Sequence, residues 1–86
     1  MIKNKEILKK KIIYRSTHRG TKEMDLLLGN FVKKNINIFK DEELIELDNM
    51  LKIEDEILSK YYYGENIVNE YIGDNKVVKL FKEFKL

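Results

Sequence analysis

Residues 18–34 read HRGTKEMDLLLGNFVKK, and this stretch decides the fold. Its apolar side chains stand at positions i, i+3, i+4 and i+7, a spacing that places them on one stripe of a helix. They are Met24, Leu27, Leu28 and Phe31. Lys33 and Lys34 would lie in the last turn, where the helix dipole favours positive charge. The stretch predicts a helix over residues 21–34 with one buried face.

The same spacing recurs on both sides, and no stretch alternates as a strand would. It predicts helices over about residues 4–16, from 41 onward, over 55–63 and at the C-terminus. Their expected inward positions are Ile7, Leu8, Ile12, Ile13, Leu44, Leu47, Met50, Leu51, Ile57, Leu58, Tyr61, Tyr62, Val77, Leu80, Phe81 and Phe84. Because 86 residues are too few for a second core, we expect one all-α domain over residues 1–86, a compact bundle of four or five short helices.

Several boundaries carry local signals. Asp41 is the expected N-cap of the third helix, since a carboxylate there can bond to free backbone N–H groups. Gly64 is placed to end the fourth helix in a left-handed conformation. Gly20 ends the first helix or turns the chain. Ile38 and Phe39, in the loop before the third helix, are both expected to point inward.

Composition excludes several kinds of site. The chain has no cysteine and one histidine, His18, which rules out disulfides, thiolate zinc sites and multi-histidine metal centres. No apolar run approaches the roughly 20 residues that a membrane span needs, so no membrane insertion is expected. The N-terminus lacks the apolar core of a secretory signal. We therefore expect a bacterial cytoplasmic protein without a metal.

Charge is unevenly distributed. Residues 1–40 carry eleven Lys and Arg against three acids, a net charge of +8, whereas residues 41–70 carry ten acids against two Lys, a net charge of −8. This split predicts either a dipolar surface that steers an acidic partner or a merely solvated basic face. Arg15 and Arg19 are accordingly either solvated or paired with the acidic middle of the chain.

Catalysis finds little support. It would need His18 together with Ser16 or Ser59, and the chain has neither a nucleophile elbow nor a phosphate-binding loop. Nucleic-acid binding would use the basic N-terminal third, but the acidic third helix would repel phosphate. No catalytic residue is predicted, and a small basic nucleic-acid-binding or regulatory protein remains the alternative to a protein-docking role.

Charged residues cluster around Gly20. They are Arg15, His18, Arg19, Lys22 and Glu23. Gly20 either supplies a turn with positive φ or, having no side chain, lets another backbone approach closely. The flanking charges offer hydrogen-bond donors and acceptors on either side. We expect residues 18–23 to be displayed as a docking surface, while residues 24–28 lean on the core.

Residues 14–29, YRSTHRGTKEMDLLLG, resemble the signature of the FAD assembly factors of succinate dehydrogenase. That family carries an R-G-x-x-E motif, which here runs from Arg19 to Glu23 and continues as Met24, Asp25 and three leucines. Residues 47–64 resemble the family's later pair of helices. The chain departs from the pattern at His18, where relatives often have a basic residue, at residues 54–56 and at Tyr61, which replaces a frequent Trp.

The resemblance implies an accessory protein that is not an enzyme. Such a protein binds the flavoprotein subunit of succinate dehydrogenase, and of fumarate reductase in some bacteria. It promotes covalent attachment of FAD to a histidine of that subunit and holds no cofactor stably itself. The partner-binding residues that the resemblance implies are Arg15, His18, Arg19, Gly20, Lys22, Glu23 and Asp25.

Overall fold

A computed structural model describes residues 4–64 and 72–86 of the chain, and the regular elements within them are all helices. They are α1 (Lys5–Thr17), α2 (Lys22–Asn35), α3 (Asp41–Met50), α4 (Asp55–Tyr62) and α6 (Lys76–Glu83). This confirms the predicted all-α bundle. Residues 65–71, between α4 and α6, lie outside the described residues.

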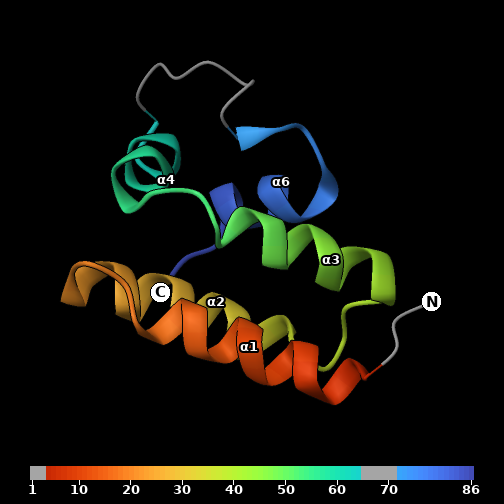
Figure 1. The fold of residues 1–86 in the computed structure, drawn as a ribbon. Coiled ribbons are helices and arrows are strands. Elements are labelled where there is room, and N and C mark those ends of the chain that lie inside the picture. The colour runs from red at the N-terminus through yellow and green to blue at the C-terminus, as the bar shows by residue number, and fades with distance from the viewer. Residues whose placement is uncertain (1–3, 65–71) are drawn as a thin grey trace.

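The helices pack in two tiers (Figure 1). α1 and α2 run antiparallel, side by side, as a helical hairpin. α3 packs on α1, and α6 packs against both α3 and α4. The ring of Phe31 in α2 meets the rings of Phe81 and Phe84 edge-on, at centroid distances of 5.5 and 5.4 Å. The C-terminal segment is thereby anchored on the hairpin.

A single apolar core joins the helices, and the predicted stripe of α2 forms its centre. The buried apolar side chains are Ile12, Met24, Leu27, Leu28, Phe31, Val32, Ile36, Phe39, Leu44, Leu47, Met50, Leu51, Leu58, Ile72, Val77, Val78 and Phe81. Leu26 lies off the stripe and is 53% exposed. Ile7 and Ile13, which were expected on the apolar face of α1, are 62% and 45% exposed, so that face is narrower than predicted. The Thr21 hydroxyl caps α2 by accepting a hydrogen bond from the Met24 N–H.

Two predictions about the loop before α3 are wrong. Ile38 is 72% exposed, while its neighbour Phe39 is buried as predicted. Of these two loop residues only Phe39 points into the core, and the adjacent Ile38 points toward solvent. The N-cap of α3 is Lys40 and not Asp41, and the Lys40 N–H donates to the Glu43 side chain at 2.8 Å. Gly64 follows α4 with φ of +83°, as the C-cap prediction requires.

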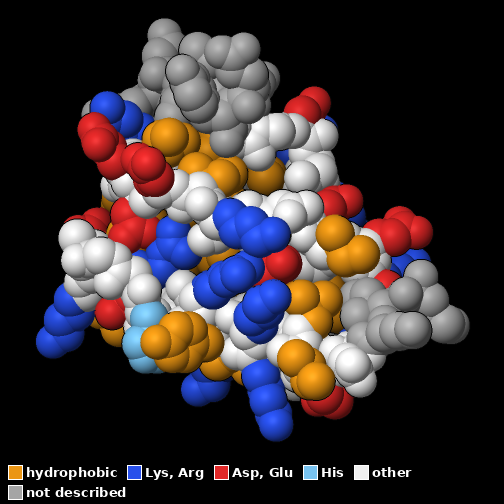
Figure 2. All heavy atoms as spheres, in the orientation of Figure 1, with side chains coloured by type: hydrophobic (Ala, Val, Ile, Leu, Met, Phe, Trp, Pro, Cys, Tyr) orange, Lys and Arg blue, Asp and Glu red, His pale blue; other side chains and the backbone are white. Residues whose placement is uncertain are grey.

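The two charge blocks of the sequence face each other across the fold. Lys5 pairs with Asp41 at 2.9 Å, and Arg15 pairs with Asp48 at 2.8 Å. Lys and Arg side chains gather on the middle of the face over α1, with acidic side chains toward α4 and the edges (Figure 2). Pairing between the blocks therefore offsets part of the charge separation that the sequence suggested, and confirms the paired alternative for Arg15.

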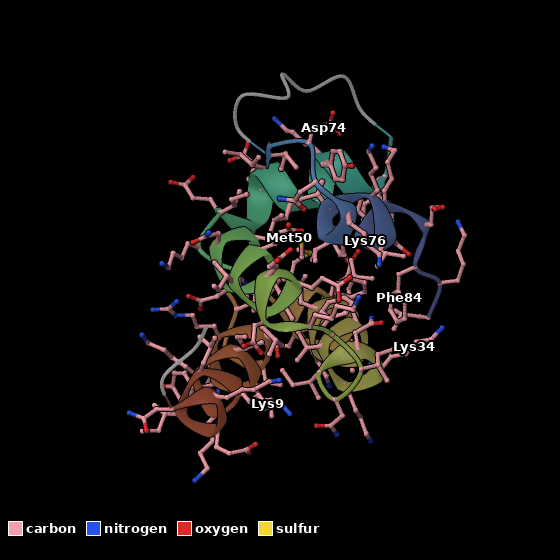
Figure 3. The ribbon with its side chains drawn as sticks, turned by 90° about the vertical axis from the view of Figure 1, so that its right-hand side faces the viewer. Lys9, Lys34, Met50, Asp74, Lys76 and Phe84 are labelled. Atoms are coloured by element: carbon pink, nitrogen blue, oxygen red, sulfur yellow. The ribbon has the colours of Figure 1, made fainter. Side chains whose placement is uncertain are left out.

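A further ion pair joins α3 to α6. Lys76 meets the Glu43 carboxylate at 2.8 Å, and the Glu43 side chain is 11% exposed. Figure 3 shows Lys76 on the same side of the molecule as Met50 and α3. The Lys40 N–H and then Lys76 hold the pKa of Glu43 below its ordinary value of 4.5, and Glu43 raises the pKa of Lys76 above its own. Each charge stabilises the other.

Replacing Leu47, whose side chain is fully buried, tests the core. Leu47→Ala should lower the free energy of unfolding by about 2–5 kcal/mol, because it removes buried methyl groups and leaves a cavity. Ile45→Ala on the same helix is the control, since Ile45 is 49% exposed, and should change it by no more than about 0.5 kcal/mol. Urea denaturation followed by far-UV circular dichroism measures both, and equal losses would contradict the assigned core.

The Glu43 contacts predict a pH dependence. Because folding lowers the pKa of Glu43, the ionised carboxylate stabilises the fold above the ordinary value of 4.5. That contribution should disappear as the pH falls through the lowered pKa. The stability gap between the wild type and Glu43→Gln, measured by urea denaturation, should be present at neutral pH and close in acid. A gap that widened in acid would show that the sign is wrong.

Candidate docking site at the turn between α1 and α2

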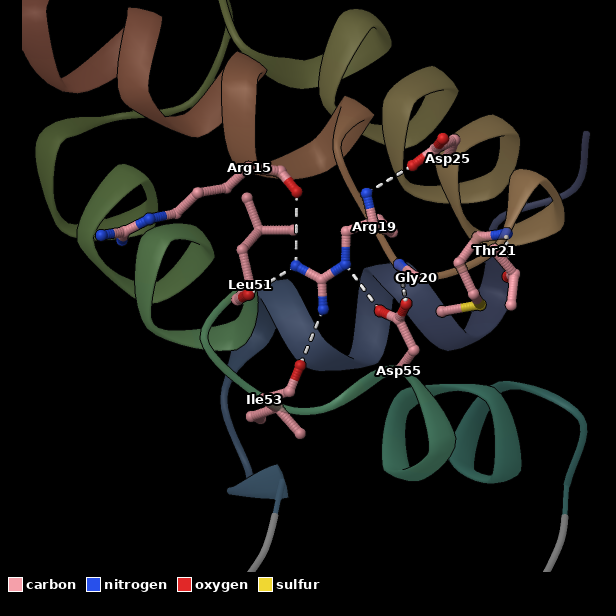
Figure 4. A network of polar contacts seen from close by, with 9 residues as sticks. Arg15, Arg19, Gly20, Thr21, Asp25, Leu51, Ile53 and Asp55 are labelled. Carbon is pink, nitrogen blue, oxygen red and sulfur yellow. Dashed lines mark hydrogen bonds and ion pairs between the residues drawn. The ribbon is translucent and has the colours of Figure 1, made fainter.

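The turn between α1 and α2 is fixed from below by the Arg19 side chain, which is only 9% exposed. The guanidinium donates to the carbonyl oxygens of Leu51 and Ile53 at 2.6 and 2.8 Å, and to that of Arg15 at 3.3 Å. Its Nε meets Asp55 at 2.6 Å (Figure 4). Leu51 is the C-cap of α3 and Arg15 lies in the last turn of α1, where carbonyl groups lack partners within the helix. One cation therefore caps two helices at once.

Asp55 uses its second carboxylate oxygen on the turn itself. Oδ2 accepts a hydrogen bond from the Gly20 N–H at 2.6 Å, while Oδ1 holds the Arg19 guanidinium. A Cβ atom built on Gly20 would lie 3.1 Å from Oδ2, tighter than ordinary contact. Gly20 does not have positive φ, whereas Gly64 and Gly73 do. The glycine is thus favoured by close approach, and the approaching group is the Asp55 side chain of the same chain.

Two further contacts complete the frame. The Arg19 N–H donates to the carboxylate of Asp25 in the first turns of α2. Arg15 is half-buried and pairs with Asp48 of α3. The backbone N–H groups of Arg19 and Gly20 are consequently both bonded to acidic side chains, which leaves the turn little freedom.

The displayed part of the turn is smaller than predicted. His18, Gly20, Lys22 and Glu23 are exposed, but the Arg19 side chain is not. The His18 ring stacks on Tyr14, with centroids 3.9 Å apart and planes inclined by 13°. The Glu23 carboxylate accepts a hydrogen bond from the Tyr63 hydroxyl at the end of α4. The predicted binding residues therefore separate into an exposed group and a set, Arg15, Arg19 and Asp25, held by contacts within the domain.

Ser16, one of the two serines that catalysis at His18 could use, is buried. Ser16 is 1% exposed, and its hydroxyl donates to the Ile13 carbonyl at 2.8 Å, so it is not placed as a nucleophile. Among residues 4–64 and 72–86, no group of three or more His, Asp or Glu side chains could hold a metal ion. No helix in that part of the chain is long and apolar enough to cross a bilayer.

A family model described as the flavinator of succinate dehydrogenase matches residues 10–85, which includes the whole turn and its supporting loop. This chain belongs to that family. The match covers α2, α3, α4 and α6 and most of α1, so it extends well beyond the short motif that first suggested the family.

Curated relatives carry matching names. The chain is 36% identical over 56 residues to the FAD assembly factor SdhE of Acetobacter pasteurianus, covering 65% of this chain and 51% of that protein. It is 32% identical over 80 residues to the FAD assembly factor SdhE of Wigglesworthia glossinidia brevipalpis, covering 93% and 90%. It is 31% identical over 80 residues to succinate dehydrogenase assembly factor 2, mitochondrial, of Arabidopsis thaliana, covering 93% and 43%.

The shared region differs in extent between relatives. The chain spans about half the length of most of these curated relatives and nearly all of the Wigglesworthia protein. No solved structure matches it significantly.

Two residues of the site were missed from the sequence. Asp55, 36 positions from Arg19, lies among residues 54–56, where the sequence departs from the family's pattern, and Tyr63 was expected only to end the fourth helix. A signal for Asp55 was present, because an acid in the first turn of a helix can also accept from a neighbouring basic residue. Nothing in the local sequence of Tyr63 points to Glu23.

Removing the Arg19–Asp55 ion pair beneath the turn should lower the stability of the fold strongly. Asp55→Ala should lower the free energy of unfolding by about 3 kcal/mol, because it leaves the buried Arg19 guanidinium without its counter-charge. Lys22→Ala, which removes an exposed charge of the same turn, should cost at most about 0.5 kcal/mol. Thermal and urea denaturation compare the two, and an Asp55→Ala protein as stable as the wild type would refute the structural role of the pair.

Proposed function

We propose that this chain is an assembly factor that binds the flavoprotein subunit of succinate dehydrogenase and promotes covalent attachment of FAD to it. The family match over residues 10–85 carries the proposal, because it includes every residue of the α1–α2 turn and of the loop that supports it. The names of the bacterial relatives agree with it. The proposed location is the bacterial cytoplasm.

The turn suits docking because its shape is set before the partner arrives. His18, Lys22 and Glu23 are exposed on a backbone that Asp25 and Asp55 hold in place. A surface that is already ordered loses little conformational entropy on binding, so more of the favourable free energy of each new contact contributes to affinity. Glu23 and Lys22 supply an acceptor and a donor for charge-assisted hydrogen bonds.

Docking acts on the partner's conformation. A factor that binds one conformer of the flavoprotein more tightly raises the population of that conformer. If that conformer aligns the receiving histidine with the flavin, attachment within the flavoprotein accelerates without a reacting group from this chain. In this proposal the chain supplies no catalytic residue and does not hold FAD stably.

The geometry changes the expected role of two motif residues. The Arg19 guanidinium is committed to Asp55 and to helix-end carbonyls, so we propose that it supports the docking surface from beneath. A side chain at Gly20 would crowd Asp55 as well as a partner. A loss of activity on substitution of Gly20 could therefore come from impaired folding or from impaired docking. Substitution of the exposed Glu23 tests docking by itself.

Glu23→Ala tests the proposal against a matched control. Purified flavoprotein subunit and FAD are incubated with each variant, and covalent flavin is read by the fluorescence of the denatured subunit. Loss of a charged hydrogen-bonding group, about 1.5–3 kcal/mol, should weaken binding by about ten- to a hundredfold and slow flavinylation at limiting factor. Glu42→Ala removes an exposed acid from the first turn of α3 instead and should match the wild type.

The same assay shows how the proposal fails. Covalent flavin that accumulates equally with and without the wild-type chain would overturn the assembly function. Equal activity of Glu23→Ala and wild type would remove the turn from the docking surface. Repeating the assay with the fumarate reductase flavoprotein determines whether that subunit is also a partner.

A further inference from the structure

The motif acid Glu23 is in contact with a residue that lies 40 positions away. The Tyr63 hydroxyl donates a hydrogen bond to Glu23 Oε1. Both residues are exposed, and the tyrosine side chain is 58% so. The contact joins the first turn of α2 to the C-cap of α4, so it brings a second element to the edge of the turn.

The hydrogen bond from the Tyr63 hydroxyl fixes the orientation of the Glu23 carboxylate, which the position of Glu23 in the helix does not fix by itself. Within residues 4–64 and 72–86, Tyr63 is the one group that bonds to the Glu23 carboxylate. An exposed glutamate otherwise samples many rotamers, and ordering them on binding costs affinity. With one carboxylate oxygen held by the hydroxyl, the other remains available to accept from a partner.

The tyrosine is itself held in position. The Tyr63 N–H donates to the Ser59 carbonyl at 3.0 Å, and Gly64, which has a positive φ of 83°, follows Tyr63 directly. Its ring packs edge-on against Tyr62 at a centroid distance of 5.0 Å. The hydrogen bond to Glu23, with partial desolvation, raises the pKa of the Tyr63 hydroxyl above its ordinary value of 10.0, at which the donor is already protonated at neutral pH.

We propose that Tyr63 is a positioning residue of the docking surface, which orients the Glu23 carboxylate for the flavoprotein and extends that surface onto the end of α4. The inference rests on the proposed function, because it assumes that Glu23 meets that partner. It assigns α4 a part in binding that the R-G-x-x-E motif does not contain.

A double-mutant cycle tests the inference. Affinity for the purified flavoprotein subunit is measured for the wild type, Tyr63→Phe, Glu23→Ala and the double variant. Tyr63→Phe keeps the ring and removes only the hydroxyl, and should weaken binding by about three- to tenfold with an unchanged melting temperature. In the Glu23→Ala background the same change should have no effect, because the group that the hydroxyl orients is gone.

Tyr62→Phe is the matched control. It removes a neighbouring hydroxyl that donates to the Phe84 carbonyl and does not face Glu23, so affinity should stay at the wild-type value. Tyr63→Phe that binds as the wild type does, or that weakens binding equally with and without Glu23, would overturn the inference while leaving the proposed function standing. A wild-type chain that does not bind the subunit would overturn both.

Discussion

The Arg19 guanidinium and the Asp55 carboxylate meet where four helix ends converge. The guanidinium bonds to carbonyl oxygens at the ends of α1 and α3, and Asp55 is the first residue of α4. The backbone of residues 19 and 20, just before α2, donates to Asp25 and Asp55. Positive charge at helix C-termini and negative charge at N-termini are both favourable. The pair therefore satisfies polar groups that the bundle would otherwise leave unpaired in a partly buried place.

The Arg19–Asp55 ion pair divides the motif into a buried part and an exposed part. Arg19 lies beneath the turn and sets its shape, while Lys22 and Glu23 lie above it and face solvent. Gly20 lies between the two parts, where a side chain would press on Asp55. Arg19 and Gly20 thus have a structural reason within the fold. Lys22 and Glu23 are exposed, and one oxygen of the Glu23 carboxylate is held by Tyr63.

The helices were predictable because their apolar residues repeat at the helical period, as at Met24, Leu27, Leu28 and Phe31 of α2. Such patterns report a local property, the face on which a side chain lies. The loop residue Ile38 has no periodic neighbours to decide its orientation, and its exposure was predicted wrongly. The site was predictable in part, since the cluster around Gly20 and the resemblance located the turn. The burial of Arg19 was not, because it depends on Asp55, whose proximity the tertiary fold alone creates.

The distribution of charge could be predicted from the sequence, but the pairing of individual charges depends on the tertiary fold. The basic and acidic blocks were evident from the sequence, and pairing with the acidic block was one of two open alternatives for Arg15 and Arg19. Only the packing of α1 on α3 decides between them, by placing Arg15 against Asp48. Net charge by segment therefore overestimated how dipolar the surface is.

Hydrogen exchange of the wild-type chain, alone and with the flavoprotein subunit, tests most directly whether this turn is the docking surface. The backbone N–H groups of Lys22 and Glu23 begin α2, where a helix has no internal acceptors for them, and both residues are exposed. They should exchange quickly in the free chain and become protected in the complex, together with the end of α4. Protection confined to other parts of the bundle, with the α1–α2 turn exchanging as fast as before, would contradict the assignment.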